Sequence, residues 1–317
     1  MKTEILLVLF SGAAAALLCA LLIPLLKRLR AGQYILGYVK EHASKGGTPT
    51  MGGIAFVAAA AAAAAAFGLL ADRHTLVALT FGLAYAAVGF LDDLLKLRGR
   101  HNLGLHAWQK IVFQMVVALF AGLYCWKSEL TLFRIPFSAV TFDAGIWTVP
   151  LVAFAFVATT NCVNLTDGLD GLAASVGFWY FAAFAALILL FSGTGSPLSG
   201  LCFALCGALA GYLLFNTNRA SVFMGDTGSL GMGGFAASVA AFSGNLLFLP
   251  VVGIMFVCSG ISVILQVIYY KRTKKRIFLM APLHHHLQEK GYAEGKIAYV
   301  YSFITAAAGL CCLFFAI

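Results

Sequence analysis

The chain has 317 residues, of which 62% are hydrophobic and only 10% are charged. Soluble domains carry about 25% charged residues, so this composition excludes an ordinary soluble protein and indicates one that spans a membrane. The formal net charge of +9 is also found in nucleic-acid-binding proteins. In so apolar a chain, however, basic residues fix the orientation in the membrane and contact anionic headgroups. We therefore expect membrane lipid as a partner and no nucleic acid.

Hydrophobic runs follow one another along the whole chain, with no soluble stretch long enough to fold alone. A helix needs about 20 apolar residues to cross the hydrocarbon core. The sequence therefore predicts an all-α polytopic membrane protein with about ten transmembrane helices, in which 1–317 form a single domain. The predicted spans cover 4–26, 51–71, 75–95, 107–126, 146–164, 171–191, 199–216, 229–245, 248–270 and 297–316.

The distribution of basic residues predicts the orientation of the chain. If the N-terminus lies outside, only four of the 21 Lys and Arg residues fall on the outer side: Lys2, Arg73, Lys127 and Arg134. Cytoplasmic segments carry an excess of Lys and Arg, so this orientation is favoured. An even number of spans returns the C-terminus to the outside as well. The outer segment 128–145 alternates apolar and polar residues, which predicts a small extracytoplasmic hairpin.

The segment that enters the second span begins with Lys45 and continues through Thr48 and Thr50 to a pair of glycines. Lys45 and the threonines offer hydrogen-bond donors to a phosphate or a base. A plain helix-entry turn containing Pro and Gly fits the same residues equally well, so this segment alone leaves both interpretations open.

Five Asp residues fall at the cytoplasmic ends of predicted spans. Asp92 and Asp93 close the third span, Asp167 and Asp170 follow the fifth, and Asp226 follows the seventh. Carboxylates at such a depth are unfavourable unless they are paired, hydrated or bound to a cation. Any one of them could be a solvated loop residue, but five that share one face favour a phosphate or metal site.

Four polar residues recur at a spacing of three at the end of the fifth span: Asn161, Asn164, Asp167 and Asp170. On a regular α-helix they would spiral around the axis. A tightened or broken helix end, which Gly168 permits, would bring them closer to one line. A helix stop rich in Asn, Asp and Gly is the common alternative. It does not explain the two amides within the apolar run, which need partners.

The turn from Phe223 to Ser229, with sequence FMGDTGS, joins the seventh and eighth spans. Its glycines and backbone N–H groups open onto a helix N-terminus and suit a phosphate. It lacks the GxxxxGK[ST] pattern of a P-loop. Asp226 in this turn is a candidate ligand for Mg²⁺, which prefers carboxylates together with phosphate oxygens.

A basic run at 271–276 precedes three consecutive histidines, His284, His285 and His286. We interpret the basic run as headgroup contact. The imidazoles can donate hydrogen bonds to a phosphate near neutral pH. Zinc is not expected, because adjacent residues point in different directions and neither Cys nor an HExxH pattern accompanies them.

Five ordered segments together resemble the polyprenyl-phosphate N-acetylhexosamine-1-phosphate transferase superfamily and, within it, the phospho-N-acetylmuramoyl-pentapeptide transferase branch. The segments are GTPTMGG at 47–53, LDDLLK at 91–96, NCVNLTDGLDGL at 161–172, FMGDTGS at 223–229 and APLHHH at 281–286. The Pro-Leu-His-His-His form is typical of this branch, whereas relatives that transfer N-acetylglucosamine phosphate space their histidines differently. The resemblance includes the ten-span layout and covers most of the chain.

The resemblance implies a Mg²⁺-dependent transferase in the bacterial inner (cytoplasmic) membrane, with its active site facing the cytoplasm. Its substrates would be UDP-N-acetylmuramoyl-pentapeptide and undecaprenyl phosphate. Its products would be lipid I and UMP, in the first membrane step of peptidoglycan synthesis. The resemblance also implies a homodimer and a ninth span that is broken and bent, whereas hydropathy predicts an uninterrupted helix over 248–270.

Two other functions fit part of the same sequence features. A relative that transfers N-acetylglucosamine phosphate would share most of the motifs. A secondary transporter, from a different class, would place its charges near the bilayer midplane on broken helices, whereas here the acids are predicted at one face.

The resemblance assigns roles to residues by motif position. Asp226 would bind Mg²⁺. Asp92 and Asp93 would hold or activate the lipid phosphate, with Lys96 nearby. His284 and His285 would lie near the diphosphate. The residues expected to contact the substrate are Lys45, Thr50, Asn161, Asn164, Leu165, Asp167, Asp170, Asn216, Phe223, His285 and His286.

Overall fold

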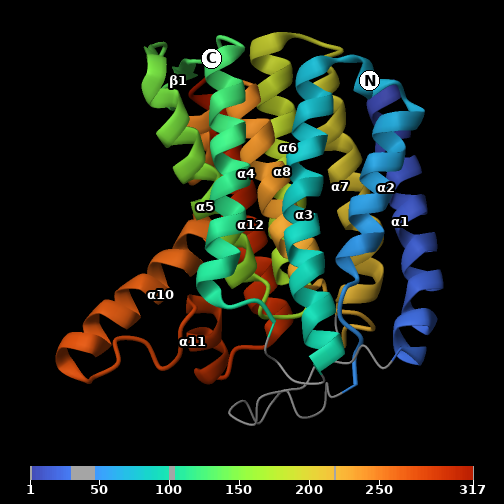
Figure 1. The fold of residues 1–317 in the computed structure, drawn as a ribbon, viewed down its shortest axis with the longest axis vertical. Coiled ribbons are helices and arrows are strands. Elements are labelled where there is room, and N and C mark those ends of the chain that lie inside the picture. The colour runs from blue at the N-terminus through green and yellow to red at the C-terminus, as the bar shows by residue number, and fades with distance from the viewer. Residues whose placement is uncertain (1, 30–46, 100–103, 218, 317) are drawn as a thin grey trace.

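The structure, a computed structural model, describes residues 2–29, 47–99, 104–217 and 219–316. Most of its helices lie side by side in one bundle, and both chain ends are at the same end of that bundle (Figure 1). The helices are α1 (Lys2–Arg28), α2 (Gly53–Ala66), α3 (Arg73–Gly99), α4 (Ala107–Lys127), α5 (Thr148–Thr166), α6 (Leu172–Ser192), α7 (Pro197–Asn216), α8 (Gly225–Phe242), α9 (Leu249–Val252), α10 (Ile254–Thr273), α11 (Leu283–Glu289) and α12 (Glu294–Phe314), with short 3-10 helices at η2 (Leu69–Ala71), η3 (Gly145–Trp147) and η4 (Leu246–Phe248).

Eight of the described helices are long and apolar enough to cross a membrane: α1, α3, α4, α5, α6, α7, α10 and α12. The prediction of an all-α polytopic membrane protein is therefore confirmed. The other two predicted spans correspond to α2, which has only 14 residues, and to α8, which has 18. Both lie within the bundle (Figure 1).

Helix α8 is the central helix, because every residue from Thr227 to Phe242 is buried. Glycines on its different sides contact different neighbours: Gly234 lies against Tyr85 of α3, and Gly233 lies against Thr160 of α5. Small residues let helix backbones approach closely in a membrane, where association depends on packing. The glycine content of α8 therefore allows α3 and α5 to pack directly against it.

The ninth predicted span is not the uninterrupted helix that hydropathy predicts over 248–270. The chain forms η4, α9 and α10 in succession, and the helix is broken at Gly253. Pro250 lies in the first turn of α9, where its missing N–H leaves no hydrogen bond unmade. Beyond the break, α10 turns away from the bundle (Figure 1). The bent ninth span implied by the family resemblance is confirmed.

A two-stranded antiparallel hairpin forms within the segment 128–145, as predicted. Strand β1 (Leu132–Arg134) pairs with β2 (Thr141–Asp143), and Phe133 lies opposite Phe142. Arg134 attaches the hairpin to the segment after α8, because its backbone N–H donates to the Gly244 carbonyl at 3.0 Å.

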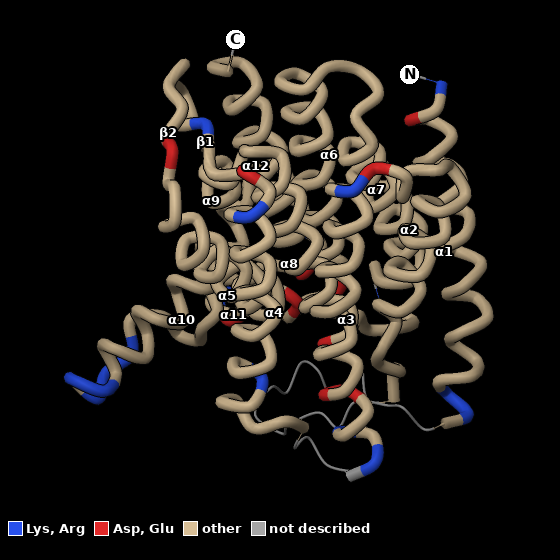
Figure 2. Tube along the Cα trace, turned by 45° about the horizontal axis from the view of Figure 1, so that its top comes forward, with Lys and Arg blue, Asp and Glu red and all other residues tan. Residues whose placement is uncertain are grey.

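Lys and Arg residues concentrate at the end of the bundle opposite the chain termini, whereas several acidic residues lie in the interior of the bundle (Figure 2). We call this end of the molecule the basic end. It is the end for which the positive-inside rule predicts a cytoplasmic location.

Candidate active site

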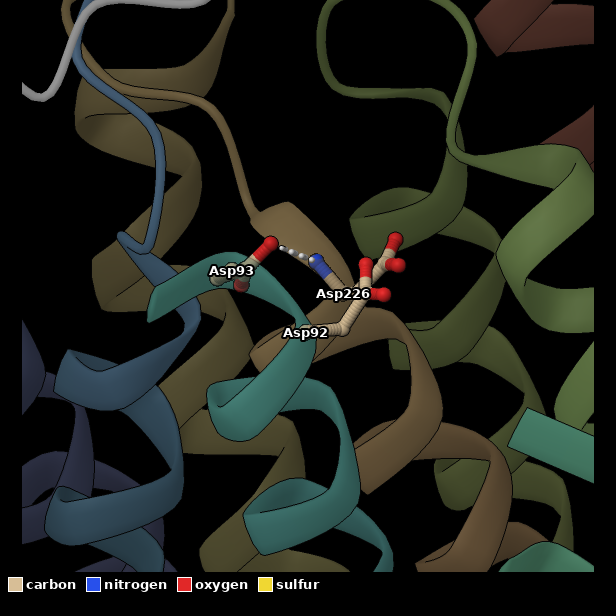
Figure 3. Close-up of side chains that lie close together, drawn as sticks. All are labelled: Asp92, Asp93 and Asp226. Carbon is tan, nitrogen blue, oxygen red and sulfur yellow. Dashed lines mark hydrogen bonds between the residues drawn. The ribbon is translucent and has the colours of Figure 1, made fainter. Parts of the chain in front are cut away.

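Three carboxylates meet near the basic end: Asp92 and Asp93 of α3 and Asp226 in the first turn of α8 (Figure 3). One oxygen atom of each lies within 4.8 Å of the others. Asp92 and Asp93 are almost completely buried. The structure thus brings together three of the five acids that the sequence predicted at one face, and we call these three residues the acidic cluster.

The close approach of α3 to the start of α8 depends on Gly89. A Cβ atom at this position would overlap the carbonyl oxygen of Asp226 and would lie 2.6 Å from the backbone nitrogen of Thr227. Any larger residue would hold the two helices apart. Gly89, one turn before Asp92, therefore permits the acidic cluster to form.

Asp93 caps the N-terminus of α8 from the neighbouring helix. Its Oδ1 accepts from the backbone N–H of Asp226 at 3.1 Å, and its Oδ2 accepts from the backbone N–H and the hydroxyl of Thr227 at 2.8 and 2.7 Å. The first N–H groups of a helix lack partners within the helix, and a carboxylate satisfies them well. The N–H groups of this turn were expected to face a phosphate, but those of Asp226 and Thr227 are already bonded to Asp93.

Asp92 and Asp226 are joined by two lysine ammonium groups. Lys96 Nζ lies 2.6 Å from Asp92 Oδ2 and 3.1 Å from Asp226 Oδ2. Lys110 Nζ lies 3.0 and 2.6 Å from the same two oxygens. The other oxygen of Asp92 accepts from the backbone N–H of Leu105 at 2.7 Å. Among the described residues, three carboxylates face two ammonium groups, so formal negative charge is in excess.

Lys110 was missed by sequence reasoning, which counted it only among the cytoplasmic charges. It lies in the first turn of α4, and Gln114 follows one turn later on the same face. Gln114 is completely buried. Two polar residues four positions apart at the start of a membrane helix lie on one face, and this spacing in the sequence could have predicted that the face points into the protein.

Helix α5 ends at Thr166, so the break predicted among the polar residues 161, 164, 167 and 170 is present. Their side chains do not line up, however, but contact different partners. Asn164 Nδ2 donates to Asp226 Oδ1 at 2.9 Å and to Ser229 Oγ at 2.8 Å. Asn161 Nδ2 instead donates to Gln114 Oε1 at 2.6 Å. Asn164 thus belongs to the acidic cluster, whereas Asn161 joins α5 to α4.

Asp170 and Asn216 connect the turn after α5 to the segment after α7. Asp170 Oδ2 accepts from the backbone N–H of Ala220 at 2.9 Å. Asn216 accepts from the N–H of Gly171 at 3.1 Å and donates to the carbonyl of Val222 at 3.0 Å. Both side chains therefore hold backbone in place beside the turn at 167–171.

Leu165 and Asp167 lie at the same turn, and each residue as a whole is only partly exposed. Burial of its carboxyl group, together with the negative charges of Asp226, Asp93 and Asp170, raises the pKa of Asp167 to about 8. The protonated form of a carboxyl group is favoured where desolvation and like charges act together. Asp167 therefore holds its proton more strongly than a free carboxyl group does.

The segment at 47–53 pairs with the turn at 223–224 through the backbone. Phe223 N–H donates to the Pro49 carbonyl at 2.8 Å, and Gly52 and Gly53 donate to the carbonyls of Phe223 and Met224 at 2.8 and 2.9 Å. This pairing places Thr50 beside the start of α8, where Thr50 and Phe223 are both partly exposed. The segment therefore does not only begin α2 but also pairs with the turn that carries Phe223. Lys45 lies outside the described residues.

The three histidines are carried by α11 and have different surroundings. His284 is completely buried, and within the described residues its ring nitrogens have no hydrogen-bond partner. Burial and the neighbouring His285 lower the pKa of His284 to about 3. His285 Nδ1 lies 3.0 Å from Gln288 Oε1. His286 Nδ1 accepts from the backbone N–H of Leu279 at 3.1 Å.

His284 and His285 lie against the turn at 167–171. A Cβ atom at Gly168 would overlap Nε2 of His284 and would lie 3.0 Å from Nε2 of His285. The histidine motif and the motif after α5, which are more than 100 residues apart in the sequence, therefore form one wall of the site.

Comparison with known proteins agrees with this geometry. Residues 75–244 match glycosyl transferase family 4. The phospho-N-acetylmuramoyl-pentapeptide-transferase of Heliobacterium modesticaldum is 42% identical over 309 residues, which cover 95% of this chain and 94% of the relative. The enzymes of the same name from Clostridium perfringens and Shouchella clausii are each 41% identical, over 94% and 93% of this chain and 94% and 92% of their own lengths. The chain belongs to the phospho-N-acetylmuramoyl-pentapeptide-transferase family.

The match to glycosyl transferase family 4 includes the acidic cluster and Asn164 but ends before α10 and α11. The histidine motif therefore lies in a part of the chain that only the full-length relatives cover. In this member of the phospho-N-acetylmuramoyl-pentapeptide-transferase family, both parts contribute to one site through the contact of Gly168 with the histidines.

Two further polar residues at the histidine wall were not predicted. Gln288 of α11 donates to Glu294 Oε1 at 3.3 Å, and Glu294 Oε2 accepts from the backbone N–H of Asp170 at 3.2 Å. Glu294 stands in the first turn of α12, where a carboxylate is favourable. In the sequence, Glu294 looks like any acidic residue in the first turn of a helix. Its contact with the site depends on the tertiary fold.

Proposed function

We propose that the chain transfers phospho-N-acetylmuramoyl-pentapeptide from UDP-N-acetylmuramoyl-pentapeptide to undecaprenyl phosphate, giving lipid I and UMP. This is the first membrane step of peptidoglycan synthesis. Family membership over nearly the whole chain supports the reaction. The observation that carries the proposal is the acidic cluster with its two lysines at the basic end. We further propose that this end faces the cytoplasm of the bacterial cell and that the enzyme is a homodimer.

Mg²⁺ is the cofactor that the donor set fits. Three carboxylates converge and lack full charge compensation from the lysines, and a hard divalent cation prefers such oxygen ligands. Asp226 would be the main ligand, with Asp92 contributing. When bound, Mg²⁺ neutralises diphosphate charge and stabilises the leaving UMP.

The neighbouring carboxylates Asp92 and Asp93 have different proposed roles. Both carboxylate oxygens of Asp93 accept hydrogen bonds from the start of α8, so we propose that Asp93 positions Asp226. Oδ2 of Asp92 is paired with the ammonium groups of Lys96 and Lys110, and a bound anion can attract these flexible lysine side chains away from it. We assign Asp92 to orienting the lipid phosphate and accepting its proton. Lys96 and Lys110 then offset the charge of the two phosphate groups.

The remaining predicted residues surround this centre, and we propose that they bind the nucleotide sugar. Phe223 and Thr50 are partly exposed beside the start of α8, where an aromatic ring can stack on uracil, and we assign Lys45 to the same nucleotide. His284 and His285 would contact the diphosphate. The other proposed contacts or supports of the substrate pocket are Asn161, Asn164, Leu165, Asp167, Asp170, Asn216 and His286.

We favour a single in-line displacement. An oxygen of the lipid phosphate forms a bond to the β-phosphorus of the UDP-sugar, and the bond from that phosphorus to UMP breaks. A two-step route would instead place the phospho-sugar on a carboxylate first. Rapid quenching during turnover followed by mass spectrometry distinguishes them, because an adduct on Asp92 or Asp93 would contradict the single displacement.

The decisive experiment measures UMP release by the purified chain from UDP-N-acetylmuramoyl-pentapeptide, with and without polyprenyl phosphate and Mg²⁺. We expect release only when all three are present, and loss of release in Asp226→Ala. Replacing the donor with UDP-N-acetylglucosamine tests the alternative sugar. Release from that donor but not from the muramoyl donor would overturn the proposed substrate.

A further inference from the structure

Before its basic last turn, helix α10 carries a polar stripe on a mostly apolar surface. Ser259, Ser262 and Gln266 are spaced three and four residues apart, which places them on one face of the helix. Ser259 and Ser262 are buried. Their neighbours Ile264 and Leu265 are 58% and 47% exposed, as expected for side chains that face lipid. The stripe is therefore the face that α10 turns toward the protein.

Residues 274–282, which we call the return segment, lead from α10 back to α11 and contain no helix or strand. Gln266 binds the backbone of this segment. Oε1 of Gln266 accepts from the backbone N–H groups of Ile277 and Phe278, both at 3.0 Å. Its Nε2 donates to the carbonyl of Phe278 at 3.1 Å. A primary amide offers both an acceptor and donors, so one side chain satisfies three main-chain groups that have no secondary-structure partner.

The contacts continue from Gln266 to the histidines. Ser262 Oγ accepts from the backbone N–H of Leu283 at 3.0 Å, immediately before His284. His286 Nδ1 accepts from the N–H of Leu279 at 3.1 Å and thereby closes the return segment onto α11. The middle of the return segment and the start of α11 are thus both fixed to α10 by side-chain hydrogen bonds.

The position of α11 matters because its histidines fit tightly against Gly168. There is no room for even one more carbon atom between Gly168 and Nε2 of His284. Protein interiors transmit such displacements, since they contain few voids. A shift of the return segment would therefore move the histidines relative to the turn that carries Asp167.

We infer that Gln266, assisted by Ser262, is a positioning residue for the histidine helix: it holds the return segment so that His284 and His285 stay against the turn at 167–171. This inference rests on the proposed function, in which the histidines contact the diphosphate of the UDP-sugar. Gln266 itself need not touch the reacting atoms, because it acts through the backbone of the return segment.

The first test compares three variants of the full-length chain. Gln266→Met has a similar length but makes none of the three hydrogen bonds, and we expect its kcat to fall by about 10- to 100-fold, the loss typical of slightly misplaced catalytic groups. Gln266→Glu keeps both acceptor contacts and should recover part of the loss. Leu265→Met, the matched control on the lipid-facing side, should keep wild-type kcat. A wild-type kcat in Gln266→Met would overturn the inference.

The second test separates positioning from a general loss of structure. Affinities for UDP-N-acetylmuramoyl-pentapeptide are measured by calorimetry for Gln266→Met, His284→Ala and the double variant. If Gln266 acts through the histidines, Gln266→Met weakens binding in the wild-type background but changes it less than about twofold when His284 is already absent. Additive losses would contradict the inference.

Hydrogen exchange provides a readout that does not depend on catalysis. The amides of Ile277, Phe278 and Leu283 should exchange faster in Gln266→Met than in Leu265→Met, and unchanged protection would count against the inference. Failure of the proposed function looks different: the wild-type chain would then neither bind nor turn over the muramoyl donor, while the exchange difference would persist.

Discussion

Gly89 is the position on α3 where a single added methyl group would act directly on the acidic cluster. In Gly89→Ala the new carbon would overlap the carbonyl of Asp226 and would lie 2.6 Å from the nitrogen of Thr227. Both atoms belong to the backbone, so no side-chain rotation relieves the clash. Helix α3 and the start of α8 must therefore separate, and the contacts of Asp93 with the N–H groups of α8 lengthen.

The size of the effect follows from packing and from catalytic geometry. Overpacking by one methyl group destabilises a protein by about 1–3 kcal/mol, which the bundle should survive. A misplacement of about 1 Å in a catalytic site lowers the rate by about 100-fold. We therefore expect Gly89→Ala to fold, to lose about 100-fold in kcat, and to bind Mg²⁺ more weakly.

A matched control exists two turns earlier on the same helix. A Cβ atom at Gly82 would overlap the ring of Phe235, which also belongs to α8. Gly82→Ala thus overpacks the same helix pair away from the site, and we expect a similar loss in the unfolding midpoint with kcat within a few-fold of wild type. The reasoning is refuted if Gly89→Ala retains wild-type turnover, or if both variants lose turnover equally.

Three further predictions concern the surroundings of the cluster. Lys110→Met removes an ammonium group shared by Asp92 and Asp226; turnover should fall by about 10- to 100-fold, from the loss of about 1.5–3 kcal/mol of charged hydrogen bonding, which steady-state assays would detect. Asn164→Leu removes a donor to Asp226 and should weaken Mg²⁺ binding by about 10- to 100-fold, as loss of a residue that orients a metal ligand does; Mn²⁺ titration followed by electron paramagnetic resonance measures this, and an unchanged affinity would separate Asn164 from the metal. Because the pKa of Asp167 is raised to about 8, the folded protein keeps a proton that the unfolded chain releases near pH 4, and stability should fall as pH rises from about 4 to 8. Asp167→Asn should flatten that slope in thermal unfolding, and identical slopes would contradict the assignment.

The sequence predicted the membrane fold well, because hydropathy depends on local composition. It failed where a helix is interrupted: Pro250 and Gly253 lie within an apolar run, and hydropathy does not register the break between α9 and α10. Hydropathy also does not distinguish a central span from a peripheral one, whereas in the structure α8 is buried on all sides and α10 leaves the bundle (Figure 1).

The candidate site was predicted through its acids and only partly through its other residues. Asp92, Asp93 and Asp226 are conspicuous because charged residues at the ends of apolar runs are uncommon. Lys110, Gln266 and Glu294 are not, since a lysine, a glutamine or a glutamate at a membrane boundary is ordinary. Their contacts depend on which face of each helix turns inward, and that is decided by tertiary packing.

Two adjacent carboxylates of the same type have separate tasks because the helix directs them to different surroundings. Successive residues on α3 point about 100° apart, so Asp93 reaches the N–H groups of α8 while Asp92 reaches the lysines and the 104–106 segment. A carboxylate that holds a helix terminus cannot leave it without releasing that helix. A carboxylate held by flexible lysine side chains can exchange them for a phosphate or a cation. The Asp92–Asp93 pair thus supplies one exchangeable and one fixed group, which is why we assign the proposed chemistry to Asp92.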